Sequence, residues 1–557
     1  MQNIYTDTRA LDRAAVSRFG LTEDILMENA ARALENEVVR ACTDRTADIR
    51  VNCSPVSECR VLIAAGGGDN GGDGWALARR LNGGTIEDFS CSVAVLEVFP
   101  PKSQACMRQA ERARSAGVPV IRNFSRTDFI KNYHVIVDCI FGSGFHGSLS
   151  AQIEKLIAAL NKADCFKIAC DIPSGIDSKG VGTSAFRADV TVCMGALKTA
   201  LFSDFAKNHT GKIITAPLGV SSALFQNGAE PAALLLEGGD LHLPERTQMS
   251  VHKGDFGHAA VYAGDKAGAG VIASCAAFRC GAGLVSLIHP EGRPLQGLCC
   301  ENNQKQEKNR EQEGCREQDG FPFYIMQTEN LPEKANLIVA GPGFGRNDVK
   351  RAEKVFSVLE ANPELNGVLD ADIFYYEGIK KLLERRPAGR PTGLVLTPHP
   401  KEFQSLLALC GFGTLSVQEI AEKRLELVSA FCSKYPEVVL LLKGANAVIG
   451  LHRAEDVKPH LYINTLGMPC LAKGGSGDVL AGFIAGLLAQ RYSPLDAAIQ
   501  GSLLLAAVSR LQKSSYSSTP FTLIQSLEEP EKLKRVLEEW GKNIGIPLEN
   551  TGQHKFR

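Results

Sequence analysis

The sequence lacks an excess of charge of either sign, a long apolar run and a secretion signal. Its 557 residues carry a formal net charge of -1, which argues against nucleic acid or a membrane as a main partner. No uninterrupted apolar stretch is long enough to cross a bilayer, and the polar, charged start of the chain, residues 1–18, is unlike a signal peptide. These absences predict a cytoplasmic protein that does not bind membranes or nucleic acid.

The cysteines form no recognisable metal-binding or redox pattern. There are 17 of them, with no CxxC pair and no Cys/His cluster at zinc-binding spacing. Most lie in apolar segments, as Cys139, Cys170 and Cys275 do, and we expect them to be reduced thiols of the core. The adjacent Cys299 and Cys300 suggest no role.

The first part of the chain, residues 1–225, alternates apolar strands with helical patterns. A helix is expected from Trp75 to Leu81, and an amphipathic helix with apolar residues at helical spacing covers 149–160. Continuous apolar strands separated by helices indicate a parallel sheet covered on both faces, with ligands at the carboxyl ends of its strands. The expected strands are 60–66, 92–96, 135–138, 167–171 and 188–192.

The alternation of strands and helices resumes after a linker expected at 226–250, so we expect residues 251–557 to form a second domain. The sequence therefore predicts an α/β protein of two doubly wound αβα domains. The polar segment 301–320 is expected to be either a disordered insertion or a solvated charged helix. Strands of the second domain are expected at 259–262, 284–289, 337–340, 367–370, 394–397 and 438–443.

The most informative motif is KGGSGD at 473–478, which is followed at once by the apolar run 479–488. Glycines expose backbone N–H groups, and the positive end of the following helix points at them, so the motif can hold an anion. A carboxylate repels phosphate, so we expect Asp478 to take a proton from a hydroxyl that attacks phosphorus. In isolation the motif would more often be a helix cap.

Three loops of the first domain follow three expected strands. They are GGGDNGGDG at 66–74, DCIFGSG at 138–144 and DIPSGID at 171–177. Asn70, Asp138 and Ser174 supply hard oxygens that suit an alkali or alkaline-earth cation. Any one loop could be a capped turn, but three loops at one sheet edge favour a binding site.

With the opening helix motif MENAARA at 27–33, these loops make residues 1–225 resemble the YjeF N-terminal family, the NAD(P)HX epimerases, which have a Rossmann-like fold. The resemblance implies potassium on Asn70, Asp138 and Ser174. Asp171 is the candidate acid or base, and it could equally serve as a ligand. The implied substrate residues are Asp69, Asn70, Gly71, Gly72, Asp73, Gly142, Ser143, Gly144, Phe145, His146, Gly147, Ser148 and Asp171.

Several motifs of the second half join the KGGSGD loop at strand ends. They are HKGDFGH at 252–258, GPGFG at 341–345, LDAD at 369–372, LTPHPKEF at 396–403 and KGANA at 443–447. Each alone would be a cap, a packed histidine or a surface charge. Their shared position at strand ends favours an active site.

With these motifs, residues from about 240 to 515 resemble the ribokinase-like superfamily and, within it, the ADP-dependent NAD(P)HX dehydratases. The resemblance implies a hydrate near Ala269, Gly343, His399 and Asp478. It places the adenine nucleotide on Lys443, Gly444, Ala445, Asn446, Ala447 and Gly477.

We therefore expect a bifunctional enzyme that epimerises the R and S hydrates of NAD(P)H and dehydrates the S form, converting ADP to AMP and phosphate. Mg²⁺ would offset the charge of the nucleotide. The alternative is a kinase of a small alcohol or vitamin, joined to a non-catalytic binding module. We also expect a homo-oligomer of undefined size.

Overall fold

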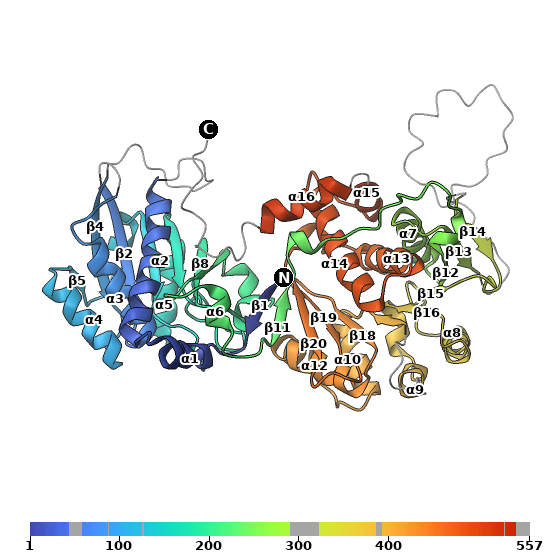
Figure 1. Ribbon diagram of the computed structural model, residues 1–557, viewed down its shortest axis with the longest axis horizontal. Helices are drawn as coiled ribbons and strands as arrows, with labels where there is room; N and C mark the ends of the chain where they lie inside the picture. Colours follow the sequence, from blue (N-terminus) through green and yellow to red (C-terminus); the bar gives the residue numbers. More distant parts are fainter. Residues whose placement is uncertain are drawn as a thin grey trace, which may run out of the picture. The chain divides into compact units, whose positions relative to one another are not determined.

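The computed structural model describes residues 1–43, 58–86, 89–124, 127–289, 322, 324–385, 393–527 and 530–541. The chain forms two compact units, residues 2–235 and residues 236–539, and each contains a largely parallel sheet with helices on its faces (Figure 1). The segment 301–320, for which an insertion is predicted, lies outside the described residues, as do Cys299 and Cys300.

The sheet of the first unit has the strand order β10-β8-β7-β6-β2-β4-β3, with β5 beside β4, and only β3 runs antiparallel to its neighbour. Within this sheet the first strand along the chain is β2. The next strands are added on one side of β2, and the chain then crosses to β6 on the other side. This reversal between β2 and β6 is a topological switch point, where ligands bind in doubly wound sheets. The strands are β2 Glu58–Ala65, β3 Thr85–Ile86, β4 Phe89–Glu97, β5 Val120–Ile121, β6 Val135–Cys139, β7 Phe166–Cys170, β8 Val190–Met194 and β10 Lys212–Ala216.

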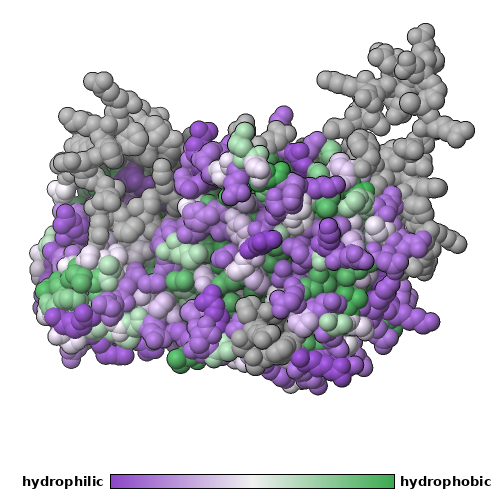
Figure 2. All heavy atoms as spheres, turned by 45° about the vertical axis from the view of Figure 1, so that its right-hand side comes forward, coloured by the Kyte–Doolittle hydropathy of each residue, from purple (hydrophilic) through white to green (hydrophobic). Residues whose placement is uncertain are grey.

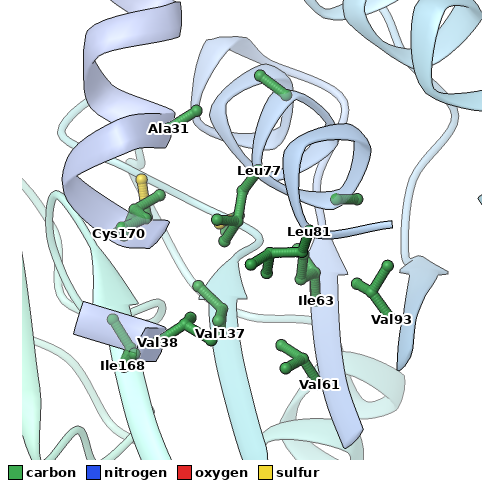
Figure 3. Packing of buried hydrophobic residues seen from close by; sticks show 14 of the residues in the cluster. Ala31, Val38, Val61, Ile63, Leu77, Leu81, Val93, Val137, Ile168 and Cys170 are labelled. Atoms are coloured by element: carbon green, nitrogen blue, oxygen red, sulfur yellow. The ribbon is translucent and has the colours of Figure 1, made fainter. Parts of the chain in front are cut away.

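Alternate residues of these strands face two different helical layers. Val61 and Ile63 of β2 belong to a core cluster with helices α2, α3 and α4, whereas Leu62 and Ala64 belong to a cluster with α5. Figure 3 shows the first cluster, with side chains of α3 close to those of β2. Burial on both faces explains why the strands are apolar throughout. The helices are α2 Glu23–Thr43, α3 Asp69–Leu81, α4 Gln104–Ser115 and α5 Ala151–Lys162.

Three short strands of the first unit form a ribbon. β1 (Gln2–Tyr5) pairs antiparallel with β11 (Ala233–Leu235) and parallel with β9 (Leu197–Lys198). Helix α1 (Arg9–Phe19) follows β1 directly.

The second unit has the order β14-β13-β12-β15-β16-β17-β18, all parallel, followed by the antiparallel β19 and β20. Its switch point lies between β12 and β15. The strands are β12 His258–Tyr262, β13 Leu284–Ile288, β14 Met326–Thr328, β15 Leu337–Ala340, β16 Asn366–Leu369, β17 Leu394–Leu396, β18 Val439–Leu442, β19 Ala447–Leu451 and β20 His460–Asn464. The helices are α7 Ala267–Arg279, α8 Val349–Ala361, α9 Gly378–Arg385, α10 Pro400–Leu409, α11 Val417–Glu422, α12 Arg424–Lys434, α13 Ser476–Ala489, α14 Pro494–Arg510, α15 Pro520–Gln525 and α16 Pro530–Gly541.

Helix α13 is buried from Val479 to its end and packs closely on α7. Two glycines permit this approach. A Cβ at Gly482 would lie 2.4 Å from the carbonyl oxygen of Ala273, and one at Gly486 would lie 2.7 Å from that of Ala277. The tight packing fixes the N-terminus of α13, where the KGGSGD motif ends.

Both units have the predicted doubly wound α/β architecture, and every predicted strand overlaps an observed one. One local expectation is wrong: helix α3 begins at Asp69 and not at Trp75, so most of the glycine-rich segment is helical. The glycines are required by packing. A Cβ at Gly71 would lie 2.0 Å from the carbonyl oxygen of Gly66, and one at Gly74 would lie 2.9 Å from the Cβ of Cys139.

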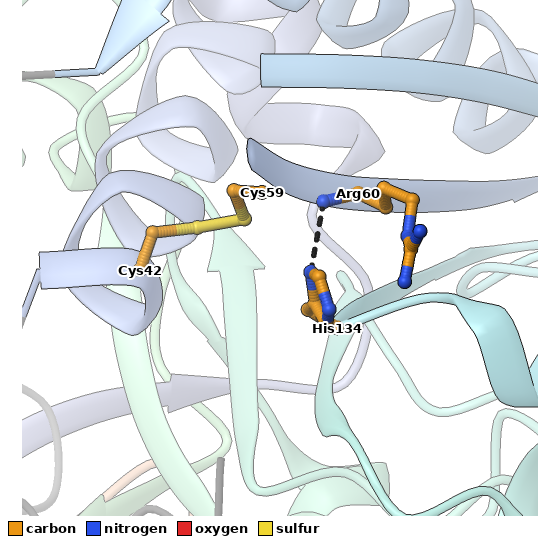
Figure 4. Close-up of a disulfide and its surroundings, with 4 residues drawn as sticks. All are labelled: Cys42, Cys59, Arg60 and His134. Atoms are coloured by element: carbon orange, nitrogen blue, oxygen red, sulfur yellow. Dashed lines mark hydrogen bonds between the residues drawn. A yellow bond between two sulfur atoms is a disulfide. The ribbon is translucent and has the colours of Figure 1, made fainter. Parts of the chain in front are cut away.

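The expectation of reduced cysteines is wrong for one pair. Cys42, near the end of α2, and Cys59, in β2, form a disulfide (Figure 4). The two elements pack together, and the Cα atoms are 6.6 Å apart, within the reach of a disulfide. Eleven other described cysteines form no disulfide, and ten of those are buried.

None of the described helices is both long enough and apolar enough to span a bilayer. The face drawn in Figure 2 mixes extensive hydrophilic areas with smaller groups of hydrophobic residues.

Candidate functional site

The first candidate site lies at the switch point of the first unit, where the loops after β2, β6 and β7 approach one another. The contact is close, because a Cβ at Gly66 would lie 1.9 Å from the carbonyl oxygen of Ile140. The first turn of α3, which carries Asn70, begins at this point.

The three predicted cation ligands come together around the backbone of Phe141. Asn70 Nδ2 donates to the carbonyl oxygen of Phe141 at 2.9 Å, and the Phe141 N–H donates to Ser174 Oγ at 2.9 Å. Asp138 is fully buried and accepts from both Ser174 Oγ and Ser174 N, each at 2.7 Å. Burial raises the pKa of Asp138 to about 6, although the hydrogen bonds from Ser174 and Ile140 favour its ionised form.

Asp171 directly follows β7 and connects two of these loops. Its backbone is left-handed, with φ of 66°, a strained conformation for a residue with a side chain. Oδ2 accepts from the N–H of Ser143 at 3.3 Å, which ties Asp171 to the loop 142–148. Oδ1 accepts from the N–H of Met194 at 3.1 Å and from Lys198 Nζ at 2.5 Å.

The other predicted substrate residues of this site differ in exposure. Gly71, Gly72 and Asp73 are buried in α3, whereas Asp69 and much of the loop 142–148 are exposed or half-buried. Burial, followed by the nearby charge of Asp171, raises the pKa of Asp73 well above its ordinary value.

The second candidate site surrounds the N-terminus of α13. Gly475 has φ of 92°, which favours glycine, and Asp478 lies in the first turn. Lys443 Nζ, at the end of β18, donates to Asp370 Oδ1 at 2.6 Å and lies 3.9 Å from Glu402 Oε2. A Cβ at Gly477 would lie 3.2 Å from the same Nζ, so the ammonium is next to the helix terminus.

His399 belongs to this cluster as the N-cap of α10. Its Nδ1 accepts from the N–H groups of Lys401 and Glu402, and its Nε2 lies 3.0 Å from Glu402 Oε1. Burial and the charge of Lys443 lower the pKa of His399. Burial raises the pKa of Glu402 to about 7.

The carboxyl group of Asp478 is a second carboxyl of this site, beside Glu402, whose pKa is raised to about 7. Burial raises its pKa to about 7, helped by the negative charges of Asp370 and Glu402 and opposed by the positive charge of Lys443. A base whose pKa lies near neutrality is well matched to removing a proton at physiological pH.

Two further groups of predicted residues have close neighbours of their own. A Cβ at Gly343 would lie 3.1 Å from the Cβ of Ala269, so this pair is in contact. In the loop 443–447, a Cβ at Gly444 would meet the Arg424 guanidinium at 2.5 Å, and Arg424 donates to the carbonyl oxygens of Leu442 and Lys443.

Sequence reasoning missed Lys198 and Arg424, and it gave no role to Glu402 or to Asp370. The signal for Lys198 was available: it is a single lysine in the apolar segment 196–202. No group of three or more His, Cys, Asp or Glu side chains suited to hold a metal ion occurs among the residues that the structure describes.

Comparison with known proteins gives matches in both units. The family model described as the YjeF-related protein N-terminus matches residues 23–200, and the model described as NAD(P)H-hydrate dehydratase matches residues 259–529. The bifunctional NAD(P)H-hydrate repair enzyme Nnr of Helicobacter pylori is 40% identical over 532 residues, covering 95% of this chain and 100% of that protein. The enzyme of the same name from Coxiella burnetii is 32% identical over 453 residues, covering 79% and 83%.

A solved structure gives a weaker match. The ADP/ATP-dependent NAD(P)H-hydrate dehydratase of Bacillus subtilis, co-crystallized with ATP/Mg²⁺, is 24% identical and covers 54% of this chain and 96% of that chain, with a TM-score of 0.39. The doubly wound fold of each unit follows from its strand order.

Proposed function

We infer that the two sites act in turn on one damaged coenzyme, because the chain belongs to the family of bifunctional NAD(P)H-hydrate repair enzymes. The first unit epimerises the R and S hydrates of NADH and NADPH. The second dehydrates the S hydrate to NAD(P)H, while ADP is converted to AMP and phosphate. The observation that carries this inference is the match to a bifunctional relative along 95% of the chain.

The dehydration begins with proton transfer to Asp478. The ring hydroxyl gives its proton to this carboxylate, and the hydroxyl oxygen attacks the terminal phosphorus of ADP, so that the phosphoanhydride bond breaks and AMP leaves. The ring now carries a phosphate ester in place of a hydroxyl. Loss of phosphate from the ring carbon, assisted by the ring nitrogen, and loss of a proton from the neighbouring carbon restore the double bond.

The surroundings of Asp478 support this chemistry. The N–H groups of Gly475 to Gly477 can stabilise the charge that develops on the transferred phosphoryl group, and the Lys443 ammonium lies beside them. We assign the nucleotide to Gly477 and the loop 443–447. We assign the hydrate to Ala269, Gly343 and His399, together with Asp478 itself.

Mg²⁺ would neutralise phosphate charge at this site when the nucleotide is bound. We expect the ion to arrive with the nucleotide, because Mg²⁺ commonly binds the phosphates of a nucleotide and takes few ligands from the protein.

For the epimerase we propose K⁺ on Asn70, Asp138 and Ser174. The donor set fits a large, hard cation, because an ionisable carboxyl, a hydroxyl and an amide converge beside the Phe141 carbonyl oxygen. Asp171 exchanges a proton with the hydrated ring. The substrate residues remain those of the segments 69–73 and 142–148.

We also propose that the protein acts in the cytoplasm as a homo-oligomer. The eleven described cysteines without a disulfide support a reducing compartment, whereas the Cys42–Cys59 disulfide opposes it. Thiol alkylation in intact cells, followed by mass spectrometry of the peptides that contain Cys42 and Cys59, shows whether these two cysteines are reduced or disulfide-bonded. Light scattering of the purified chain gives its oligomeric state.

Replacing Asp478 by Asn tests the dehydratase assignment. The variant should fold and bind ADP, but dehydration of the S hydrate should fall by about two to four powers of ten, the usual contribution of a proton-transfer group. The return of reduced-nicotinamide absorbance gives the rate, and calorimetry gives ADP binding. Parent-like turnover in this variant would refute the assigned role.

A further inference from the structure

Lys198 is a charged residue in the interior of the first unit, and it has no role in the reactions proposed for the two sites. Its side chain is 2% exposed, and its Nζ lies 2.5 Å from Asp171 Oδ1. Nζ also donates to the carbonyl oxygen of Met194 at 3.1 Å, and it lies 3.5 Å from that of Ala196. These contacts occupy all three N–H groups of the ammonium, so Lys198 retains no donor for a substrate.

The backbone fixes the position of this ammonium. Lys198 belongs to β9, which pairs with β1, and the residue opposite it is Tyr5. A tight turn joins β8 to β9, with Gly195 at φ of 72° and the Ala196 N–H bonded to the Met194 carbonyl at 2.8 Å. The turn brings the lysine back onto the end of β8, beside Asp171.

The two oxygens of Asp171 therefore have different environments. Oδ1 accepts from Lys198 Nζ and from the N–H of Met194, whereas Oδ2 accepts only the longer bond from the N–H of Ser143 among the described residues. Ser143 belongs to the loop assigned to the substrate. Oδ2 is thus the oxygen that faces the ligand.

The ammonium also has an electrostatic role, because two more carboxyl groups face this pair. Asp12 of α1 and Asp73 of α3 both interact with Asp171, and the Cys193 thiol of β8 lies 3.6 Å from Lys198 Nζ. Burial raises the pKa of Asp12 to about 6, and Lys198 opposes that rise. Without Lys198, the charge of Asp171 would face other carboxyl groups in a buried site with no cation beside it.

We propose that Lys198 is the positioning residue of the epimerase site, holding Oδ1 of Asp171 so that Oδ2 is directed at the hydrated ring. The proposal rests on the epimerase function given above. Lys198 acts through Asp171 and does not contact the substrate.

Four variants of the full chain test this role: Lys198→Met, Lys198→Gln, Asp171→Asn and the Lys198→Met/Asp171→Asn double variant. The probe is purified R hydrate, and chromatographic separation of the epimers gives kcat and KM across a pH series. Dehydration of the S hydrate by the same preparations reports the integrity of the rest of the chain.

We expect Lys198→Met to lower kcat for epimerisation about a hundredfold or more while KM changes little. Lys198→Gln, which can donate a hydrogen bond but is uncharged, should be intermediate. The double variant should be no slower than Asp171→Asn, since Lys198 acts only through that residue.

Parent-like epimerisation by Lys198→Met overturns the proposal, and so does a double variant far slower than Asp171→Asn. If Lys198→Met does not fold, the kcat of Lys198→Gln decides, and a parent-like kcat overturns the proposal. Parent-like epimerisation by Asp171→Asn would refute the assigned role of Asp171, which is a different failure.

Discussion

At the residue scale, the two aspartates assigned to proton transfer differ in whether the nearby lysine bonds them directly. Asp171 is paired with a buried ammonium and two backbone N–H groups. Asp478 lies near two other carboxyl groups, and the single lysine nearby is bonded to Asp370. The arrangement around Asp478 makes its ionisation costly and leaves a base of pKa about 7.

The pH dependence of dehydration should report this difference. Asp478 acts as a base only when ionised, so kcat for the S hydrate should fall as the pH drops below about 7. The charge of Asp370 raises the pKa of Asp478, so Asp370→Asn should move this acid limb to lower pH. Steady-state rates across a pH series measure the shift, and an unmoved limb would contradict the electrostatic account.

The raised pKa of Asp478 also makes the stability of the fold depend on pH. A carboxyl whose folded-state pKa is raised stabilises the fold below its ordinary pKa, and that contribution is lost as the pH rises through about 7. The Asp478→Asn variant should therefore gain stability relative to the parent between about pH 4 and pH 8. Urea unfolding at the two pH values gives the difference.

Ser174 offers a test of the cation site. Its hydroxyl donates to Asp138 and accepts from the Phe141 N–H. Ser174→Ala therefore removes one proposed ligand and also a hydrogen bond to a second proposed ligand, Asp138. We expect about tenfold more K⁺ to be needed for half-maximal epimerisation. The assay varies KCl while choline chloride keeps the ionic strength constant. Ser115→Ala, at the exposed end of α4, is the control, and equal K⁺ requirements would contradict the assignment.

At the element scale, the chemistry depends on where two helices begin. The N-termini of α3 and α13 are both placed by glycines that let backbone segments approach closely. The sequence marks these glycines but does not say whether they serve a flexible loop or tight packing. That ambiguity is why the segment 69–74 was predicted as a loop and is helical.

Packing of α13 on α7 should be sensitive to one methyl group. Gly482→Ala places a Cβ 2.4 Å from the Ala273 carbonyl oxygen, so we expect a loss of about 1–3 kcal/mol in the free energy of unfolding. Dehydration should fall as well, because the start of α13 moves. Gly268→Ala, in α7 with open space around it, should lose no stability. Equal denaturant midpoints for parent and Gly482→Ala would contradict this packing argument.

At the scale of the whole molecule, the apolar strands were the part of the fold that sequence could predict. Strands buried on both faces are apolar throughout, and their order along the chain indicates the doubly wound pattern. Short strands such as β1, β9 and β11 carry no comparable signal, because they have only two to four residues. The pairing of Lys198 with Asp171 could not be predicted either, because β9 and the turn before it bring the two residues together.

The alternative of a kinase with a non-catalytic module differs from repair in its product. A kinase would leave a stable phosphorylated substrate, whereas repair restores the reduced ring. Because the two reactions occur at different sites, a substitution in one site should abolish one reaction and leave the other intact.

The most direct measurement is the restoration of reduced-nicotinamide absorbance from a mixture of R and S hydrates with ADP and Mg²⁺. The parent chain should convert the whole mixture. In the same time, Asp171→Asn should stop after the S fraction, and Asp478→Asn should restore nothing while still interconverting the epimers. Complete conversion by Asp171→Asn at the parent's rate, or any parent-like restoration by Asp478→Asn, would contradict the account.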